Sequence, residues 1–320
     1  MMSDQNHYHQ TIKIAVVGDI HDQWEAADGI ALKHLGVDLV LFVGDFGNES
    51  VEVVRSIASL DIPKAAIFGN HDAWYTATDW GRKRCPYDRH QENRVQQQID
   101  ILGPIQVGFS KLDFPHLNLS VVGSRPFSWG GPEWKYGDFY REYYQVNSFT
   151  ESTERIIEAV QKTAYETIIF IGHNGPTGLG DRPEDPCGKD WNPIGGDFGD
   201  PDLAAAIDQT RLLGKSIPLV TFGHMHHHLR HTKTEVRKAV HVSPEETVYV
   251  NAAQVPRIIE IEENTHNGIS PVISRQRNFS VVSLVGGKVA EVALVWVDCD
   301  RALTSEKILY RKSRTFLQIA

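Results

Sequence analysis

The feature that most constrains this chain is a short apolar run that recurs and ends each time in glycine followed by a polar residue. Each run is rich in Val, Ile, Leu and Phe, which is typical of a strand buried on both faces. The run-ending pairs are Gly18-Asp19, Gly44-Asp45, Gly69-Asn70, Gly123-Ser124, Gly172-His173 and Gly223-His224. Because ligands gather at the carboxyl edge of α/β sheets, we expect the acidic, amide and histidine side chains of these pairs to share one rim.

Helical periodicity between several of these runs predicts an α/β fold. Apolar stripes recur at helical spacing in segments 24–35, 51–58 and 156–160, and a proline-started helix is predicted from Asp200 to Gly214. Alternating strands and helices favour right-handed crossovers with mainly parallel pairing. The tail differs, because segments 279–284 and 288–297 flank two glycines as in an antiparallel hairpin.

Composition narrows the class of protein. The formal charge of −9 argues against a protein that coats nucleic acid, and no apolar run is long enough to cross a membrane. The first ten residues resemble neither a signal peptide nor a transit segment. Cys85, Cys187 and Cys299 are predicted to be free thiols in a reducing compartment. We therefore expect a cytoplasmic globular protein.

The polar residues at the strand ends form a potential ligand set. Carboxylate, amide and imidazole groups without thiolate suit Mn, Fe, Zn or Co rather than a structural zinc site. These groups exceed what one ion can use, which favours two ions about 3.5–4 Å apart. The groups come from Asp19, His21, Asp45, Asn70, His71, Asp72, His173, His224 and His226.

In this order, the motifs resemble those of the calcineurin-like metallophosphoesterases. They are Asp19-x-His21, Gly44-Asp45, Gly69-Asn70-His71-Asp72, Gly172-His173 and Gly223-His224-x-His226, and the resemblance extends from Ile14 to Asn251. It implies a four-layer α/β-β/α sandwich, with two mixed β-sheets flanked by helices. It also implies a hydrolase that acts on phosphoester bonds through a dinuclear metal centre and a metal-bridging hydroxide.

The resemblance also implies a role for each motif residue. One metal would be held by Asp19, His21, Asp45 and His226, and the second by Asp45, Asn70, His173 and His224. His71 would protonate the departing oxygen, and Asp72 would orient His71 and keep it protonated. An aspartate at this last position is common among the phosphodiesterases of the family. Mn or Fe is favoured for the two ions, with Zn, Co or Ni as alternatives.

Other residues near these motifs have two interpretations. Arg125 follows a strand end, so it is predicted to bind a substrate phosphate, and the alternative is a surface arginine that fixes its loop. His227, His228 and His231 extend the histidine run, and we expect them to be solvated or to support the ligands. Asn251 ends a further strand, and we expect it to support the site structurally.

Three insertions of about 73–116, 127–149 and 177–199 interrupt a single predicted domain at 12–300, between a polar tail at 1–11 and an extension at 301–320. The aromatic second insertion could stack a nucleobase or form a satellite core. The third insertion follows His173 directly and should line the groove. Its acidic residues would repel a polyanion; they are Asp181, Glu184, Asp185 and Asp190.

These observations predict a phosphodiesterase that hydrolyses a small or nucleotide-type substrate. The alternatives are a phosphomonoesterase or protein phosphatase, a nuclease, and a non-catalytic binding scaffold. The expected partner is a small phosphoester, with no membrane and no nucleic acid. The natural substrate and the oligomeric state do not follow from the sequence.

Overall fold

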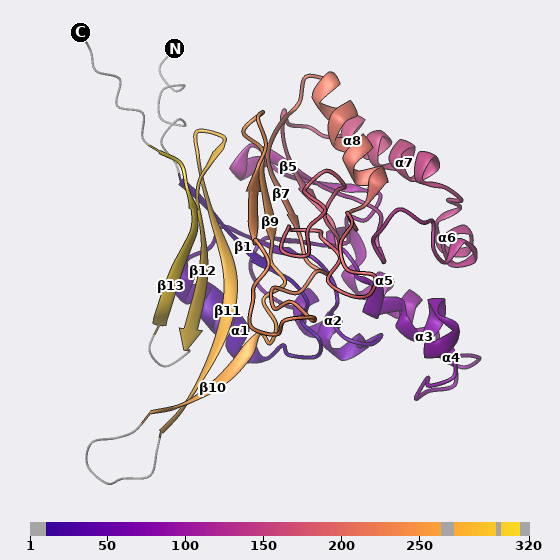
Figure 1. Ribbon diagram of the computed structural model, residues 1–320, viewed down its shortest axis with the longest axis horizontal. Coiled ribbons are helices and arrows are strands. Elements are labelled where there is room, and N and C mark those ends of the chain that lie inside the picture. Colours follow the sequence, from indigo (N-terminus) through magenta and orange to yellow (C-terminus); the bar gives the residue numbers. More distant parts are fainter. Residues whose placement is uncertain (1–10, 264–271, 299–301, 314–320) are drawn as a thin grey trace.

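Two mixed β-sheets lie face to face in the computed structural model, with helices over the outer face of each (Figure 1). The structure describes residues 11–263, 272–298 and 302–313. The fold is therefore the four-layer sandwich of α/β type that the resemblance implied.

The first sheet has seven strands in the order β13-β12-β11-β1-β2-β3, with β10 also paired to β11. β1, β2 and β3 run parallel, and the strands from the end of the chain add antiparallel pairs. The strands are β1 (Thr11–Val17), β2 (Leu39–Phe42), β3 (Lys64–Ala66), β10 (Ile258–Glu263), β11 (Val272–Val285), β12 (Lys288–Asp298) and β13 (Ala302–Arg311).

The second sheet has six strands in the order β4-β5-β6-β7-β9-β8. Its central strands β5, β6, β7 and β9 are parallel, and β4 and β8 close the two edges antiparallel. The strands are β4 (Lys111–Phe114), β5 (Leu119–Gly123), β6 (Thr167–Ile171), β7 (Ser216–Phe222), β8 (Val240–Val242) and β9 (Val248–Asn251).

The helices connect these strands or belong to the insertions. α1, α2 and α5 lie on the outer side of the first sheet, and α7 and α8 cover the second. The α-helices are α1 (Ala26–Leu35), α2 (Val51–Ala58), α3 (Trp74–Ala77), α4 (Asp79–Arg82), α5 (Arg94–Leu102), α6 (Gly137–Tyr144), α7 (Phe149–Gln161) and α8 (Pro201–Leu212). Short 3₁₀ turns are η2 (Asn70–Ala73), η3 (Gly103–Ile105) and η4 (Pro115–Leu117).

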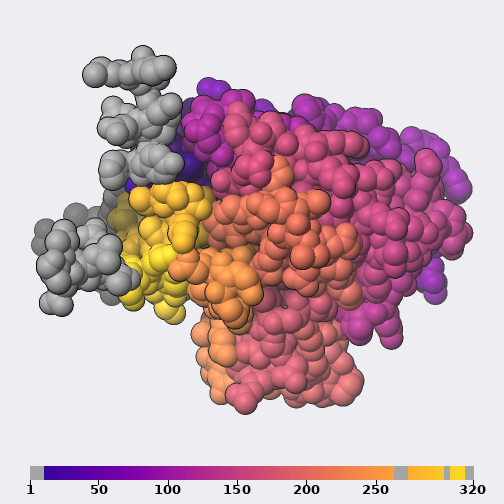
Figure 2. Space-filling model, turned by 90° about the horizontal axis from the view of Figure 1, so that it is seen from above, coloured from indigo at the N-terminus to yellow at the C-terminus, as the bar shows by residue number. Residues whose placement is uncertain are grey.

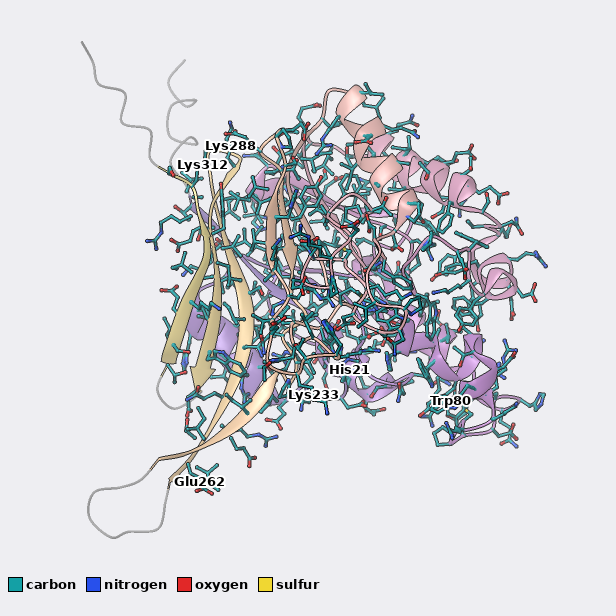
Figure 3. The ribbon with its side chains drawn as sticks, viewed as in Figure 1. His21, Trp80, Lys233, Glu262, Lys288 and Lys312 are labelled. Carbon is teal, nitrogen blue, oxygen red and sulfur yellow. The ribbon has the colours of Figure 1, made fainter. Side chains whose placement is uncertain are left out.

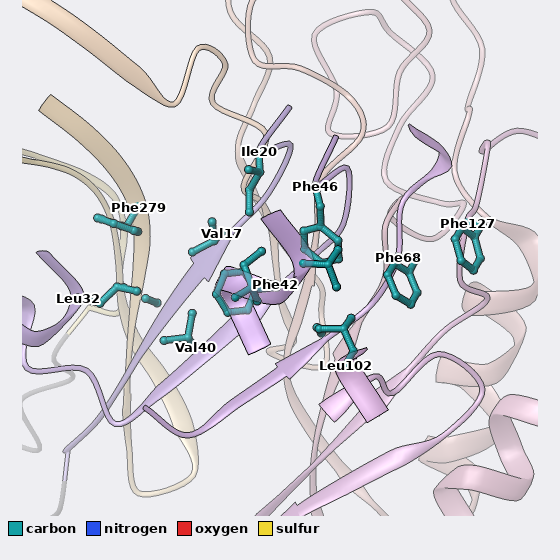
Figure 4. Close-up of a cluster of buried hydrophobic side chains, with 14 of the residues drawn as sticks. Val17, Ile20, Leu32, Val40, Phe42, Phe46, Phe68, Leu102, Phe127 and Phe279 are labelled. Atoms are coloured by element: carbon teal, nitrogen blue, oxygen red, sulfur yellow. The ribbon is translucent and has the colours of Figure 1, made fainter. Parts of the chain in front are cut away.

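Alternation along each strand distributes the core between layers. In β2, Leu39 and Leu41 pack between the two sheets, whereas Val40 and Phe42 pack under the helices of the first sheet. Figure 4 shows this second cluster, in which the rings of Phe42, Phe46, Phe68 and Phe127 follow one another. Because these strands are buried on both faces, the apolar residues of each run are continuous and do not alternate with polar ones.

Each of the six apolar runs forms a strand, and the predicted helices and tail hairpin are also present. The predicted C-terminal boundary at residue 300 is wrong, because β13 pairs with β12 and is an edge strand of the first sheet. At the other end, β1 already begins at Thr11, inside the predicted tail. Cys85 and Cys187 are free thiols, and Cys299 lies outside the described residues. Within the described parts of the chain, no helix is long and apolar enough to cross a membrane.

Candidate metal centre

The predicted ligands lie where strands of both sheets end. Asp19, Asp45 and Asn70 follow β1, β2 and β3 of the first sheet, whereas His173 and His224 follow β6 and β7 of the second. Backbone bonds join these loops, since Gly223 N–H donates to His173 O at 2.7 Å and His21 N–H donates to Asp45 O at 2.8 Å. Figure 3 shows His21 where the loops from the two sheets converge. The ligands therefore share a rim formed by two sheets rather than by one.

The turns that present these side chains are strained or tightly packed. Asp19, His21, Asp45 and His224 adopt positive φ angles of 48°, 45°, 55° and 66°, a region that costs non-glycine residues energy and is concentrated at functional sites. Gly69 allows a close approach, because a Cβ there would lie 2.3 Å from Asp45 Oδ1 and 2.6 Å from His173 Cε1. The glycine before the polar residue is thus a steric requirement of the site.

One group of potential ligand atoms comes from Asp19, His21 and His226, and these atoms lie within 4.8 Å of one another. His226 Nε2 is 3.2 Å from Asp19 Oδ2 and 3.2 Å from His21 Nε2. The Asp19 carboxylate also fastens the two sheets together, since its Oδ1 accepts from the backbone N–H of His224 at 3.0 Å.

A second group comes from Asp45, His173 and His224, with the same 4.8 Å limit. His173 Nε2 lies 2.9 Å from Asn70 Oδ1 and 3.2 Å from His224 Nδ1. Asp45 faces both groups, because its Oδ1 is 3.3 Å from His173 Nε2 and its Oδ2 is 3.9 Å from His21 Nε2. The structure thus brings all seven predicted ligands together in the predicted division, with Asp45 between the two groups.

The donor set fits metal ions. His173 Nδ1 lies 2.8 Å from Val43 O, so this nitrogen carries the proton and Nε2 turns a lone pair toward the oxygens of Asn70 and Asp45. Asp19 Oδ2 is buried without a hydrogen bond. Lone pairs that converge in this way repel one another unless a cation lies between them.

The protonation states of Asp45 and His224 also suit metal binding. Burial, followed by the neighbouring His173, lowers the pKa of His224 to about 3, which leaves a neutral imidazole able to bind metal. Burial alone would raise the pKa of Asp45, but the imidazoles of His173 and His71 outweigh it and hold that pKa below its ordinary value. The site therefore presents an ionised carboxylate beside a neutral histidine at neutral pH.

The expected partnership between His71 and Asp72 is wrong in its geometry. Asp72 is fully buried and accepts the backbone N–H groups of Gly69, Phe46 and Asp45 at 2.7, 2.9 and 3.1 Å. Burial and the charge of Asp45 raise the Asp72 pKa well above its ordinary value. Asp72 thus holds the two ligand loops together and does not orient the His71 ring.

Asn48 is the partner of His71 that sequence reasoning missed. Its Oδ1 lies 2.6 Å from Nδ1 of His71, so Nδ1 donates and Nε2 is the other ring nitrogen. The pKa of His71 is lowered, chiefly by burial. A signal was present in the sequence, because Asn48 lies in the same strand-end loop as Asp45.

The prediction that Arg125 binds substrate phosphate is also wrong. The side chain is buried, with Nε donating to Asp202 at 2.8 Å and an Nη donating to Asp200 at 2.9 Å. A third contact, from its other Nη, reaches the hydroxyl of Tyr140 at 3.2 Å. Arg125 therefore joins the second insertion to the start of α8, and it is buried rather than the surface arginine of the alternative interpretation.

The remaining histidines support the site or face solvent. His227 is buried and its Nε2 lies 2.9 Å from Asn251 O, and the Asn251 amide donates to Met225 O at 2.8 Å. His228 and His231 are exposed. The expected structural role of Asn251 is confirmed, because this amide fixes the loop that carries His224 and His226.

A pocket of about 300 Å³ opens beside the ligand groups. Every insertion contributes to its lining, which makes the expected role of the third insertion correct. In Figure 2 the loop after β6 and the loop after β7 lie side by side, and Asp190 joins them by accepting from Arg230 N at 2.9 Å. The residues that line the pocket are Asp45, Asn70, His71, Trp74, Trp129, Lys135, Asp190, Trp191, Phe198, His224, Met225, His226, Arg230 and Arg237.

Two expectations about the insertions concern their aromatic and acidic residues. Most aromatic residues of the second insertion form a satellite core, since Phe127, Phe139 and Tyr140 are buried in the first sheet's outer cluster, and only Trp129 reaches the pocket. In the third insertion, Asp190 pairs with Arg237 and Asp185 pairs with Lys238. Two of the four acidic residues are therefore paired with cations, and the expected repulsion of a polyanion stays a prediction.

Comparisons with known proteins find a family model and solved structures that are similar to this chain. The family model of the calcineurin-like phosphoesterases matches residues 12–228. A protein from Thermus thermophilus is 12% identical, with a TM-score of 0.47 over 94% of this chain and 100% of that chain. A dimetal phosphatase from Danio rerio is 11% identical, with a TM-score of 0.43 over 94% and 99%. A comparison with curated protein sequences finds no match.

The family model covers more than half of the chain and includes every predicted ligand and His71. A phosphoesterase of this family needs ligands for metal ions. The converging lone pairs and the neutral imidazole of His224 are suited to that role. The chain therefore belongs to the calcineurin-like phosphoesterase family and is a phosphoester hydrolase.

Proposed function

We propose that this protein is a phosphodiesterase that uses two metal ions to hydrolyse a small or nucleotide-type phosphodiester in the cytoplasm. The observation that carries the dinuclear centre is the Asp45 carboxylate, whose two oxygens face the two ligand groups. Asp19, His21 and His226 would complete one ion's ligands, and Asn70, His173 and His224 the other's. Mn or Fe suits such mixed oxygen and nitrogen ligands. The free thiols of Cys85 and Cys187 fit the proposed compartment.

When bound, the ions would supply positive charge to the phosphate oxygens and lower the pKa of a water. The chain's own contribution centres on His71, which lines the pocket beside the ligands. Asn48 accepts the Nδ1 proton and fixes the ring, so the doubly protonated ring would be the form that gives its Nε2 proton to the departing oxygen and is left neutral with the proton on Nδ1. Trp74 stacks on the same ring at 4.7 Å and limits its rotation.

The pocket supports a diester more than a phosphorylated protein. Its volume of about 300 Å³ suits a small molecule. A diester carries one negative charge and two organic groups, and the pocket offers apolar aromatic surface beside the phosphate position. A monoester, with two negative charges and one organic group, would use this surface less.

Steady-state kinetics on bis-p-nitrophenyl phosphate and p-nitrophenyl phosphate, with added Mn²⁺, test this proposal. We expect a higher kcat/KM on the diester and about two metal ions per chain by elemental analysis. A higher kcat/KM on the monoester would replace the proposal with a phosphomonoesterase.

A matched histidine pair controls for contaminating activity. His226→Ala should lose both metal content and activity, because His226 lies among the ligand atoms. The exposed neighbour His228, changed to alanine, should keep both. Equal behaviour of the two variants would contradict the assigned site.

A further inference from the structure

Four aromatic side chains line the pocket beside the ligand groups, and they come from all three insertions. Trp74 belongs to the first insertion, Trp129 to the second, and Trp191 and Phe198 to the third. Each of the four is half-buried. Half-buried aromatic rings gathered in a concave site are typical of ligand binding.

These rings differ from the other aromatic residues of the second insertion. Trp134, Tyr136, Tyr143 and Tyr144 pack against the core of the first sheet. The four pocket aromatics are absent from the three apolar clusters found in the described part of the chain. Trp129 also contacts Tyr136, with ring centroids 4.8 Å apart, so packing beside that core accounts for part of its position, but not for the gathering of all four rings in the pocket.

Contacts between the rings hold them as two pairs. Trp74 stacks on His71 at 4.7 Å and 13°, and Trp129 follows Trp74 at 5.2 Å. Trp191 meets Phe198 edge to face at 4.8 Å. The first pair thus extends from His71 along the pocket lining.

Two positively charged side chains lie beside these aromatic rings. Lys135 Nζ lies 4.6 Å from the Phe198 ring centroid, and the Arg230 guanidinium lies 5.5 Å from that of Trp191. Among the described residues, neither Lys135 nor Arg230 makes a side-chain ion pair, whereas Arg237 is paired with Asp190. Two pocket cations are therefore available to an anionic ligand.

From these observations we infer that the aromatic pairs form a subsite for a planar aromatic group of the substrate, which stacks on Trp129 and Trp191 while its phosphate lies at the ligand groups. The inference rests on the proposed function and specifies its substrate class. A nucleobase and a simple aryl group share the required flat π surface, and stacking on tryptophan does not distinguish them by itself.

Calorimetric titration of the Mn²⁺-loaded protein with adenosine 5′-monophosphate, phenyl phosphate and ribose 5-phosphate tests the subsite. We expect at least tenfold tighter binding of an aromatic ligand than of ribose 5-phosphate, which lacks the ring. Preference for the adenosine compound identifies a nucleobase site, and preference for phenyl phosphate identifies an aryl site. Equal affinities for all three ligands would overturn the inference.

Tryptophan variants test which rings bind the aromatic ligand. Trp129→Leu and Trp191→Leu should each weaken binding of the aromatic ligand about tenfold and leave ribose 5-phosphate binding unchanged. Trp296→Leu is the matched control, because Trp296 is half-buried on β12 and is absent from the pocket lining. Trp129→Phe, which keeps a ring, should restore most of the affinity. Variants that behave like Trp296→Leu would overturn the subsite.

The same samples separate this inference from the proposed function. Turnover of bis-p-nitrophenyl phosphate tests the diesterase, and ligand binding requires no turnover. Turnover without a preference for aromatic ligands would remove the subsite and keep the function. A preference for aromatic ligands without turnover would keep the subsite and remove the proposed function.

Discussion

At the scale of single residues, two buried charged groups near the site have structural roles instead of chemical ones. Asp72 accepts three backbone N–H groups from the loops that carry Asp45 and Asn70. Arg125 donates to Asp200 and Asp202 in a fully buried network. Each is held by hydrogen-bond partners that the fold supplies, since an unpaired buried polar or charged group is costly.

The position of Asn48 leads to a prediction about pH dependence. Asn48→Asp would place a carboxylate against Nδ1 of His71, which is now 2.6 Å from a neutral amide. The new charge should raise the His71 pKa by about 1–3 units, so that the protonated acid persists to higher pH. The alkaline limb of the kcat profile should then move upward, and Asn48→Ala should lower kcat. An alkaline limb that stays in place in Asn48→Asp would contradict the pairing.

Replacement of Arg125 should affect stability and not substrate binding. Arg125→Met leaves Asp200 and Asp202 without their buried cation, which we expect to cost about 3–5 kcal/mol of unfolding free energy. Arg211→Met, which breaks surface pairs with Asp208 and Glu245, should cost at most about 1 kcal/mol. Urea unfolding measures both. A raised KM in a fully stable Arg125→Met protein would support the phosphate contact instead.

At the scale of elements, the turn between a strand and the next segment determines the site. β3 ends at Ala66, and Gly69 then leads into η2, which carries Asn70 and His71. The turn brings the Gly69 backbone against the side chains of Asp45 and His173. A turn with a Cβ at this point would separate the two sheets' ligands.

Gly69→Ala should therefore lose metal while the fold persists. The added methyl would overlap Asp45 Oδ1 at 2.3 Å and push apart ligands of the second group. Gly29→Ala is the control, because its Cβ in α1 would meet only Leu60 Cδ1 at 3.2 Å. Elemental analysis of the two variants after reconstitution with Mn²⁺ gives the comparison. Full metal content in Gly69→Ala would show that the turn tolerates a side chain.

At the scale of the whole molecule, polar contacts join the two sheets at two separate places. At the site, Asp19 of the first sheet accepts from His224 of the second. Elsewhere, Glu246 in the β8–β9 loop pairs with Lys288 of β12 and with Lys312, which follows β13 (both lysines are labelled in Figure 3). Apolar packing fills the space between these contacts.

The Glu246 cluster gives an acid-range prediction. Lys288 and Lys312 lower the Glu246 pKa from 4.5 to about 2, so its stabilising effect is complete above pH 4.5 and is lost as the pH falls toward 2. The Tm difference between wild type and Glu246→Gln should follow this window and shrink in high salt. A difference that is constant from pH 7 to pH 2.5 would exclude the linkage.

Local composition and periodicity are sufficient to predict the strands, the helices between them and the order of the polar strand ends. The six runs form strands, and a glycine precedes five of the seven predicted ligands, all except His21 and His226. Tertiary structure alone decided that the ends of two different sheets meet, that Asn48 and not Asp72 contacts the His71 ring, and that Arg125 turns inward. These outcomes depend on contacts between distant segments. Sequence motifs indicate which residues lie near the site, but they do not specify which side chain each one contacts.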